Sequence, residues 1–316
     1  MTGHGGIILS PGALTTIQDR GRTGYQALGI PVSGALDRFA RRMANALVDN
    51  PPGCAVLEMT VVGLTLAVLH PMDLAFTGAG MPIMRNHAPM APWRAFRVEP
   101  GDLLTFGMAG SGCRGYLAVR GGFDVPEVMG SRATYLGGKL GGMTGRPLQK
   151  GDLLPVAPAP PLGTPRCLPD DYWPAYPDEI VLRAIPGPQA DDFTRAIDRF
   201  FEIPFTLDTR TDRMGCRLDG PVIALDPGSQ QSIISEPVVP GSVQIPADGH
   251  PIILLGEQTS GGYAKIATVI SPDLSRLAQA TPGVVIHFER VDIETAHRIY
   301  REETMRRDQI IQSLIR

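Results

Sequence analysis

The sequence predicts a mainly β protein made of two related lobes followed by a C-terminal helix. Glycine and proline together supply 67 of the 316 residues, about a fifth of the chain, where average usage is roughly 12%. Turn residues at this frequency favour many short strands over long helices. Three short motifs also recur in the same order on either side of a proline-rich segment, residues 157–178. This recurrence predicts two related halves.

The first half differs from the second by an added helix. The spacing between the two copies is shorter for the second motif than for the first, which indicates an insertion in the first half. Residues 33–48 fit it, because Leu36, Phe39, Met43 and Leu47 recur at helical spacing with arginines on the other face. The recurring pairs are QDRGRTG (18–24) with TDRMGCR (211–217), VLEMTVVG (56–63) with IISEPVVPG (233–241), and PGDLLTF (100–106) with PGVVIHF (282–288).

These observations give a domain plan. We expect a first lobe at 1–156 with the helix at 33–48, a linker at 157–178, a second lobe at 179–290 and a helix at 291–316 that Asp292 caps. Closed or partly closed antiparallel barrels would hide so many strand edges. Another helix is expected near 190–201. The strands are expected at 7–10, 61–69, 73–79, 95–106, 115–123, 179–185, 221–225, 232–235, 241–246, 251–256, 263–270 and 283–291.

Composition argues against several classes of protein. The longest uncharged apolar stretch, Met59–Leu69, is too short to cross a bilayer, and the N-terminus does not resemble a signal peptide, so we expect a cytoplasmic protein without a membrane partner. The net charge is −3 and the basic residues are scattered, which argues against nucleic acid as a partner. Four separated cysteines and six isolated histidines signal neither a disulfide framework nor a metal site.

Familiar catalytic motifs are missing, and polar clusters between glycines and prolines remain. GGKLGG (137–142) is not a P-loop, because its lysine comes too early and no hydroxyl follows it. No G-x-S-x-G occurs. An Asp-Arg pair in a turn can belong to a binding or catalytic site, or it can be a local structural salt bridge. The sequence leaves both interpretations open for these clusters. The polar clusters contain Gln18–Arg22 (with Asp19 and Arg20), Ser33, Asp37, Glu58, Thr77–Gly80, Gln189, Thr211–Arg213, Ser235–Pro237, Gln244, Tyr263 and Lys265.

Several long strings resemble one protein family over roughly residues 5–290. They include TTIQDRGRTGYQALGIPVSGALDR, LAVRGGFDVPEVMGSRATYL, SEPVVPGSVQIPADGHPIILL and TSGGYAKIATVI. The chain is similar to the KipA family, also described as allophanate hydrolase subunit 2, biotin-dependent carboxyltransferase, or the C-type subunit of bacterial 5-oxoprolinase. The resemblance implies two tandem cyclophilin-like β-barrel lobes, which agrees with the duplication.

The resemblance also implies an activity and partners. Family members act with a KipI-like B-type subunit, and a related pair forms the carboxyltransferase part of urea carboxylase. In 5-oxoprolinase, the B-type and C-type subunits are thought to act with a LamB/YcsF-type subunit of the A type to open 5-oxoproline to glutamate with ATP. The expected function is therefore the C-type subunit of an ATP-dependent 5-oxoprolinase hydrolase, or a related carboxyltransferase acting on a small amide or lactam. Two alternatives stay open: a regulator that binds a KipI-like histidine kinase inhibitor, and a carbohydrate- or peptide-binding module.

The lysines show whether this chain could carry biotin covalently. Biotin is normally attached to a lysine between methionines, and Lys139, Lys150 and Lys265 all lack a methionine neighbour. This chain is therefore not the biotin carrier, and we expect no covalently bound cofactor: the complex uses ATP, and any carboxybiotin arrives on a separate carrier chain.

Both reactions would need donors for a developing negative charge and a base for an amide proton. Arg20, Arg213 and the backbone at Thr77–Gly80 and Ser260–Gly262 are the candidate donors, and Lys265 could bind a carboxylate. Glu236 or Asp212 is the first choice of base, with Glu58 or Asp19 as counterpart. Departures from the family pattern at Cys216, at Lys139–Leu140 and in LLGEQTSGG bear on substrate specificity. The expected catalytic residues are Asp212, Glu236, Arg213 and Lys265, and the expected substrate-binding residues are Asp19, Arg20, Ser33, Asp37, Glu58, Gln189, Ser235, Gln244 and Tyr263.

Overall fold

The structure is mainly β-sheet with four α-helices, which confirms the predicted class, and a computed structural model describes it for residues 3–230 and 232–315. The ends of the predicted first lobe and of the C-terminal helix, at 1–2 and 316, lie outside the described residues. The chain forms two compact units. Unit 1 comprises Met1–Arg22, Ser33–Tyr176 and Arg307–Arg316, and unit 2 comprises Thr23–Val32 and Pro177–Arg306. The proline-rich segment thus belongs to unit 1 as far as Tyr176.

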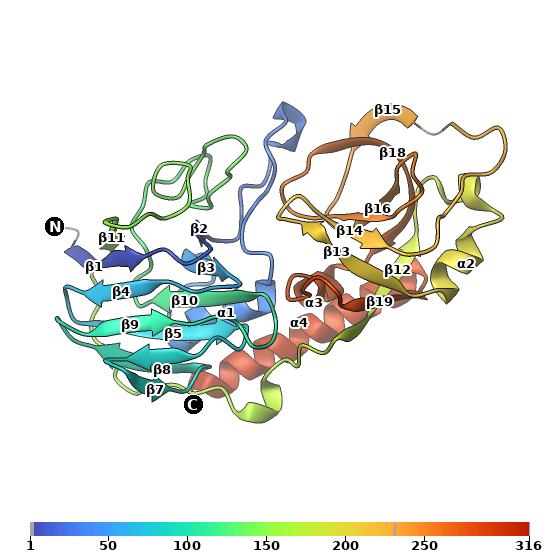
Figure 1. Cartoon of the computed structure of the whole chain (residues 1–316). Coiled ribbons are helices and arrows are strands. Elements are labelled where there is room, and N and C mark those ends of the chain that lie inside the picture. Colours follow the sequence, from blue (N-terminus) through green and yellow to red (C-terminus); the bar gives the residue numbers. More distant parts are fainter. Residues whose placement is uncertain (1–2, 231, 316) are drawn as a thin grey trace. The chain divides into compact units, whose positions relative to one another are not determined.

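Unit 1 contains two antiparallel sheets (Figure 1). The six-stranded sheet has the order β11-β1-β4-β9-β6-β7, and the five-stranded sheet has the order β2-β3-β10-β5-β8. Phe76 of the smaller sheet and Phe106 of the larger one pack with ring centroids 5.1 Å apart, so the two sheets share a hydrophobic core. The strands are β1 (Gly3–Ser10), β2 (Leu14–Gln18), β3 (Val56–Thr60), β4 (Thr65–Val68), β5 (Met72–Gly78), β6 (Ile83–Arg85), β7 (Ala88–Met90), β8 (Arg94–Val98), β9 (Leu103–Phe106), β10 (Arg114–Val119) and β11 (Leu153–Val156).

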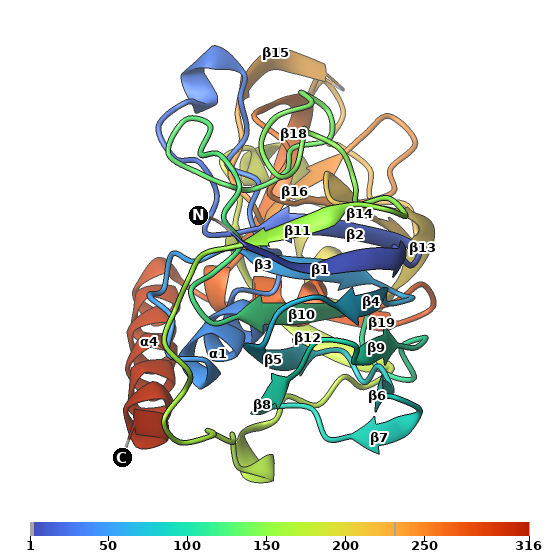
Figure 2. The same ribbon diagram turned by 90° about the vertical axis from the view of Figure 1, so that its left-hand side faces the viewer.

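Helix α1 (Arg38–Leu47) lies within the predicted range 33–48 and packs on β5 and β10. It begins after Asp37, whose carboxylate accepts a hydrogen bond from the Ala40 N–H at 3.0 Å, as a helix N-cap does. Met43, Leu47 and Ile310 of helix α4 (Ile293–Ile315) belong to one hydrophobic cluster, and Figure 2 shows α1 and the C-terminal end of α4 near each other. The arginines are expected on the face opposite the apolar residues, but Arg41 is only 7% exposed.

Unit 2 contains one eight-stranded sheet with the order β12-β19-β13-β14-β17-β16-β18-β15. β12 also pairs with β18, so the strand order returns to its start, with β15 as an additional strand on β18. All these pairs are antiparallel except β12 with β19. The strands are β12 (Glu179–Pro186), β13 (Phe205–Thr211), β14 (Gly215–Asp219), β15 (Ser232–Pro237), β16 (Ser242–Ile245), β17 (Ile252–Leu254), β18 (Ser260–Val269) and β19 (Val285–Arg290).

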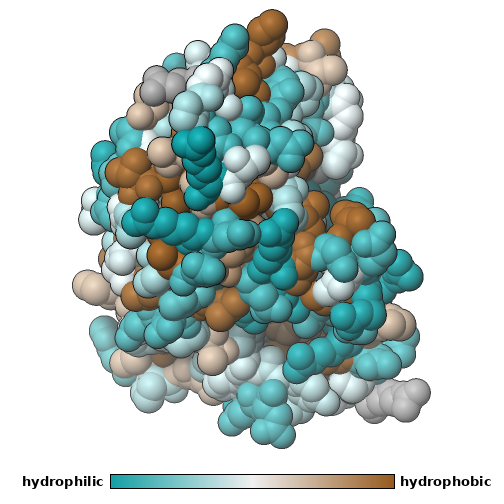
Figure 3. Space-filling model, turned by 90° about the vertical axis from the view of Figure 1, so that its right-hand side faces the viewer, coloured by the Kyte–Doolittle hydropathy of each residue, from teal (hydrophilic) through white to brown (hydrophobic). Residues whose placement is uncertain are grey.

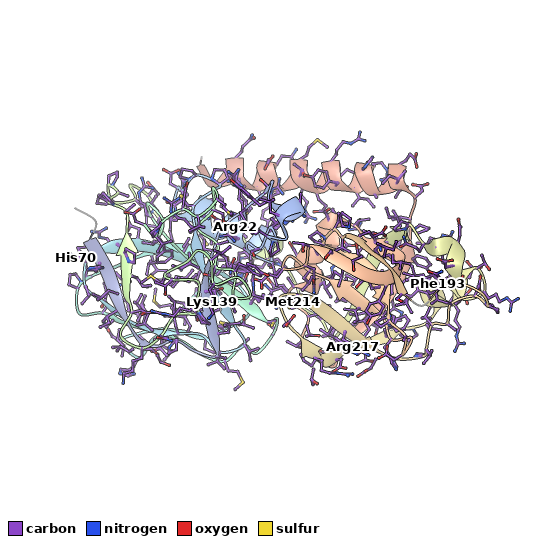
Figure 4. All side chains as sticks on the ribbon, turned by 90° about the horizontal axis from the view of Figure 1, so that it is seen from above. Arg22, His70, Lys139, Phe193, Met214 and Arg217 are labelled. Atoms are coloured by element: carbon purple, nitrogen blue, oxygen red, sulfur yellow. The ribbon has the colours of Figure 1, made fainter. Side chains whose placement is uncertain are left out.

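The helix predicted near 190–201 is two short pieces, because Asp226 interrupts it. The N–H groups of Thr194 and Arg195 donate to the Asp226 carboxylate instead of continuing a helical ladder. Phe193 is buried beside the segment that contains α2 (Figure 4). The pieces are η3 (Ala190–Phe193) and α2 (Ile197–Glu202), and the remaining helices are η1 (Gln26–Leu28), η2 (Asp170–Tyr172), η4 (Ser271–Asp273), α3 (Leu274–Leu277) and α4 (Ile293–Ile315).

Residues 221–225 and the start of the C-terminal helix test two further predictions. The prediction of a strand at 221–225 is wrong, because this part of the described chain is irregular and the Ile223 N–H donates to the Gly249 carbonyl. The predicted cap of the C-terminal helix is confirmed, because Asp292 accepts from the Thr295 N–H at 2.7 Å.

The surface shown in Figure 3 is mixed in hydropathy. On the face shown in Figure 3, hydrophobic side chains form small separate areas among hydrophilic ones, as on ordinary protein surfaces. Within the described residues, no helix has the length and apolar character that a membrane crossing requires.

Candidate functional site

Four predicted site residues meet in unit 2 because of how β18 is paired. Lys265 lies on β18 and is paired with Gln244 of β16. The other neighbour of β18 is β15, where Glu236 is paired with Gly261. Gln189 follows β12, and its N–H donates to the Lys265 carbonyl at 3.3 Å. Strand pairing thus gathers residues that are far apart in the sequence.

The central contact is an ion pair between Lys265 and Glu236. The Nζ–Oε1 distance is 2.6 Å, and the side chains are 3% and 40% exposed, respectively. The Gln189 Nε2 donates to the same carboxylate oxygen at 2.9 Å, while the Gln189 Oε1 accepts from the Lys265 N–H at 3.1 Å. The Lys265 ammonium also lies 3.4 Å from the Tyr263 carbonyl. An amine, an amide and a carboxylate are therefore fixed relative to one another.

The electrostatics of this cluster favour the charged form of Glu236. Hydrogen bonds from Lys265 and then from Gln189 lower the pKa of this carboxyl, and they outweigh the opposing effect of desolvation. Glu236 is therefore ionised at neutral pH. A carboxylate with a lowered pKa is a weaker base, so these contacts suit a residue that holds the Lys265 cation in place.

Gln244 supplies a donor with no protein acceptor. Its side chain is 5% exposed, and its Nε2 is buried and lacks a hydrogen-bond partner among the residues described. The amide occupies the space beside Gly261 that a Cβ there would fill. A buried amide without a partner is costly, and this one lies on the strand next to Lys265.

Asp212 and Arg213 make other contacts. The Asp212 carboxylate accepts from the N–H groups of Met214 and Gly215 at 2.7 and 3.2 Å, which stabilises the turn between β13 and β14. The buried Arg213 donates from Nε to Glu257 Oε1 at 2.6 Å, and both side chains are 5% exposed. Neither contact involves the Lys265 cluster.

Ser235 and Tyr263 lie beside the cluster at the surface. Ser235 is exposed on β15, and its Oγ would be 3.3 Å from a Cβ on Gly262. The Tyr263 side chain is 40% exposed, and its carbonyl is the atom near Lys265. These positions allow either residue to contact a ligand at β18.

In unit 1, Glu58 lies in a buried network. Glu58 Oε2 accepts from the Tyr116 hydroxyl at 2.8 Å and from the Leu36 N–H at 3.0 Å. The Tyr116 oxygen accepts from the Asp37 N–H at 2.9 Å. Burial, followed by the charges of Glu58 and Asp37, raises the pKa of Tyr116 well above its usual value. The phenol therefore stays protonated, and the network fixes the chain before α1.

Asp19 is also enclosed by donors. Its carboxylate accepts from the Gly21 N–H at 2.7 Å, the Ser131 Oγ at 2.7 Å and the Arg132 N–H at 2.6 Å. Ser33 is buried with φ +55°, a region that disfavours side chains, and its Oγ has no partner in the described part of the chain. Arg20 is exposed, whereas Arg22, labelled in Figure 4, is fully buried.

The backbone donors expected at Thr77–Gly80 are already used. The Ala79 and Gly80 N–H groups donate to the carbonyls of Arg114 and Ser111, both at 2.8 Å. They cannot also stabilise a ligand oxygen, so that expectation is wrong at these two groups. Ser260–Gly262 is part of β18 and lies opposite Glu236.

The arrangement in unit 2 suits a ligand with a carbonyl or carboxylate group. A protonated amine and an amide N–H are both donors, and charge-assisted donors bind carboxylates strongly. Among residues 3–230 and 232–315, no group of three or more His, Cys, Asp or Glu side chains could hold a metal ion.

Three residues that the structure shows to be important were not identified from the sequence. Tyr116 and Glu257 become significant through buried contacts with Glu58 and Arg213, and Arg41 through its burial. None of the three had a local sequence signal, because each depends on contacts or packing that only the fold supplies.

Comparison with known proteins gives consistent relatives. The model of the carboxyltransferase domain family, subdomain A and B, matches residues 28–290. The C-type subunit of 5-oxoprolinase from Escherichia coli strain K12 is 37% identical over 94% of this chain and 94% of its own length. Its counterpart in Haemophilus influenzae is 36% identical over 96% of both chains. The crystal structure of Kluyveromyces lactis urea carboxylase matches with a TM-score of 0.92 and 29% identity, over 98% of this chain but 29% of that larger chain.

Proposed function

Because the chain belongs to the carboxyltransferase domain family, subdomain A and B, we propose that it is the C-type subunit of an ATP-dependent 5-oxoprolinase. The chain is homologous both to the C-type subunit of bacterial 5-oxoprolinases and to part of urea carboxylase. The first relationship supports the proposal more strongly, since the match extends over nearly the whole length of both chains. A closely related carboxyl transfer to an amide is the second reaction compatible with this family.

One observation carries the assignment of the site. The Lys265 ammonium is almost fully buried, paired with Glu236 and adjacent to the strand that carries the unpartnered Gln244 amide. Opening a lactam requires addition to its carbonyl carbon, which places negative charge on the carbonyl oxygen before the C–N bond breaks. Lys265 and Gln244 supply donors for that oxygen. Glu236 holds the lysine in position through the ion pair, and Gln189 orients Glu236.

The same donors bear on the cofactors. A carboxylate carried by biotin would meet the Lys265 cation and the Gln244 amide, so the donor set fits that group. Bound carboxybiotin would supply the carboxyl group for transfer, and it would have to arrive on another chain. We assign ATP to the complex as a whole.

We also propose partners for this chain. The bacterial relatives are named as one lettered subunit of an enzyme, which indicates that their enzymes have further subunits. The proposed partners are a KipI-like B-type subunit together with a LamB/YcsF-type subunit of the A type, and the proposed location is the cytoplasm.

The test is reconstitution with both partner subunits and measurement of ATP-dependent glutamate release from 5-oxoproline. Lys265→Met should lower kcat by about 10²–10³-fold, the usual effect of losing one oxyanion donor. Lys150→Met, at an exposed lysine, is the matched control and should be fully active. Size-exclusion chromatography checks that each variant assembles.

Two results would contradict the proposal in different ways. Full activity of the Lys265→Met complex would remove the site assignment. An assembled wild-type complex that releases no glutamate, but carboxylates urea or another amide from carboxybiotin, would replace the 5-oxoprolinase assignment with carboxyl transfer.

A further inference from the structure

Arg41 of unit 1 is a buried cation without a counter-ion. Its side chain is 7% exposed, and no carboxylate lies within ion-pair distance of it among the residues described. Nη1 donates to the Pro52 carbonyl at 2.6 Å, whereas Nε is buried and has no hydrogen-bond partner in the same described residues. Arginine is almost never buried without a paired charge, so this position needs an explanation.

Two other arginines lie near Arg41. The Arg20 guanidinium borders the residue next to Pro52, since a Cβ on Gly53 would be 3.4 Å from Arg20 Nε and 3.5 Å from Nη2. Arg42 follows Arg41 on α1. Burial lowers the pKa of Arg41 to about 10, and Arg42 and Arg20 contribute to the lowering. Arg41 nevertheless remains protonated at neutral pH.

The nearby negative charge is already engaged. Asp19 is the carboxylate that favours the charged form of Arg41, but its oxygens accept from the Gly21 N–H, the Ser131 Oγ and the Arg132 N–H. Tyr116 would favour the charged form of Arg41 only as a phenolate, and its raised pKa keeps it neutral. The carboxylate that favours the charged form of Arg41 is therefore committed to other donors, and the carboxylate that acts on Arg42 is a different one, Asp308.

We propose that the Pro52–Gly53 loop of unit 1 carries a binding site for a small oxyanion, held by Arg20 and Arg41. An anion there would supply the missing counter-charge and an acceptor for the Arg41 Nε, and Arg20 would close the site from the solvent side. Guanidinium groups form paired hydrogen bonds with both carboxylates and phosphates. The ligand class is thus a phosphate or a small carboxylate, and the two arginines belong to unit 1, whereas the Lys265 cluster belongs to unit 2.

The experiment uses the purified full-length chain without partner subunits. Isothermal titration calorimetry is run with inorganic phosphate in one arm and 5-oxoproline in the other, with chloride holding the ionic strength constant. A binding event in either arm is expected, and the tighter arm identifies the source of the oxyanion. Thermal unfolding in the same buffers should show a higher Tm with the ligand that binds, because it binds the folded state.

Variants decide whether these arginines form the site. Arg41→Met and Arg20→Gln should each raise the Kd at least about tenfold, equivalent to about 1.4 kcal/mol, and should abolish the Tm increase. Arg94→Gln, at an exposed arginine of unit 1, should change neither the Kd nor the Tm increase. If Arg41→Met does not fold, Arg20→Gln decides alone.

The inference is overturned if neither oxyanion binds, or if the Arg20→Gln protein binds as tightly as the wild type. Because binding is measured without turnover, failure here leaves the proposed 5-oxoprolinase activity unaffected. An inactive complex, in turn, would leave this site unaffected.

Discussion

Lys265 and Glu236 form an ion pair whose two ends differ in solvent access: the ammonium is 3% exposed and the carboxylate 40%. The buried cation gains a full counter-charge, and the carboxylate keeps part of its hydration. Such an arrangement avoids the large desolvation cost of a pair buried at both ends. It also leaves the lysine fixed next to the strand that carries Gln244.

The first prediction concerns the titration of Glu236. Lys265 and Gln189 lower its pKa in the folded protein, so the ion pair stabilises the fold above the unfolded-state pKa and is lost as the pH falls through the lower folded-state value. NMR titration of a Glu-labelled protein should give a midpoint below the usual glutamate range. In Lys265→Met the midpoint should rise towards that range. A midpoint unchanged by the substitution would show that Lys265 does not control this carboxylate.

The second prediction concerns the space beside Gln244. In Gly261→Ala the new Cβ would overlap the Gln244 amide, whereas in Gly262→Ala it would be 3.3 Å from the nearest atom, Ser235 Oγ. Gly261→Ala should therefore displace Gln244, lower the free energy of unfolding by about 1–3 kcal/mol and reduce kcat in the reconstituted complex. Gly262→Ala should lower the free energy of unfolding, measured by urea denaturation, and kcat by smaller amounts. Equal effects would argue against a functional position for the Gln244 amide.

The third prediction concerns Tyr116. Tyr116→Phe removes the hydroxyl that donates to Glu58 and accepts from the Asp37 N–H, so it should lower the free energy of unfolding by about 1–3 kcal/mol. Tyr172→Phe, at a residue 39% exposed, is the matched control and should leave it unchanged. Urea denaturation measures both. If Tyr116→Phe leaves the free energy of unfolding unchanged, the network does not anchor the start of α1.

The fourth prediction separates a turn role from a catalytic role at Asp212. Its Oδ1 accepts from the N–H two residues ahead at 2.7 Å, as Asp19 Oδ1 does in unit 1. Asp212→Asn retains that acceptor, so the reconstituted complex should keep full turnover. Asp212→Ala should cost about 1 kcal/mol of stability without abolishing activity. The sequence alone pointed to a catalytic Asp212, and a loss of activity in Asp212→Asn would restore that interpretation.

Local patterns in the sequence predicted the features that depend on neighbouring residues. Turn residues and short alternating segments indicated the β class, and Asp292 marked the start of α4. The helix expected at 33–48 begins only at Arg38, after the Asp37 cap. The repeated motifs were less informative about topology. PGDLLTF contains β9, which pairs antiparallel with both β4 and β6. PGVVIHF leads into β19, which pairs parallel with β12 and antiparallel with β13.

The sequence by itself determined the mainly β class, the presence of a helix within 33–48, the start of α4, and a set of polar residues that includes Lys265, Glu236 and Gln244. Only the tertiary structure decided which of these meet, because strand pairing joins residues distant in the chain. It also decided burial: Glu58 is 1% exposed, and Arg41 on a helix face rich in arginines is 7% exposed. Whether a charge is hydrated or enclosed depends on what packs over it, and no local pattern records that.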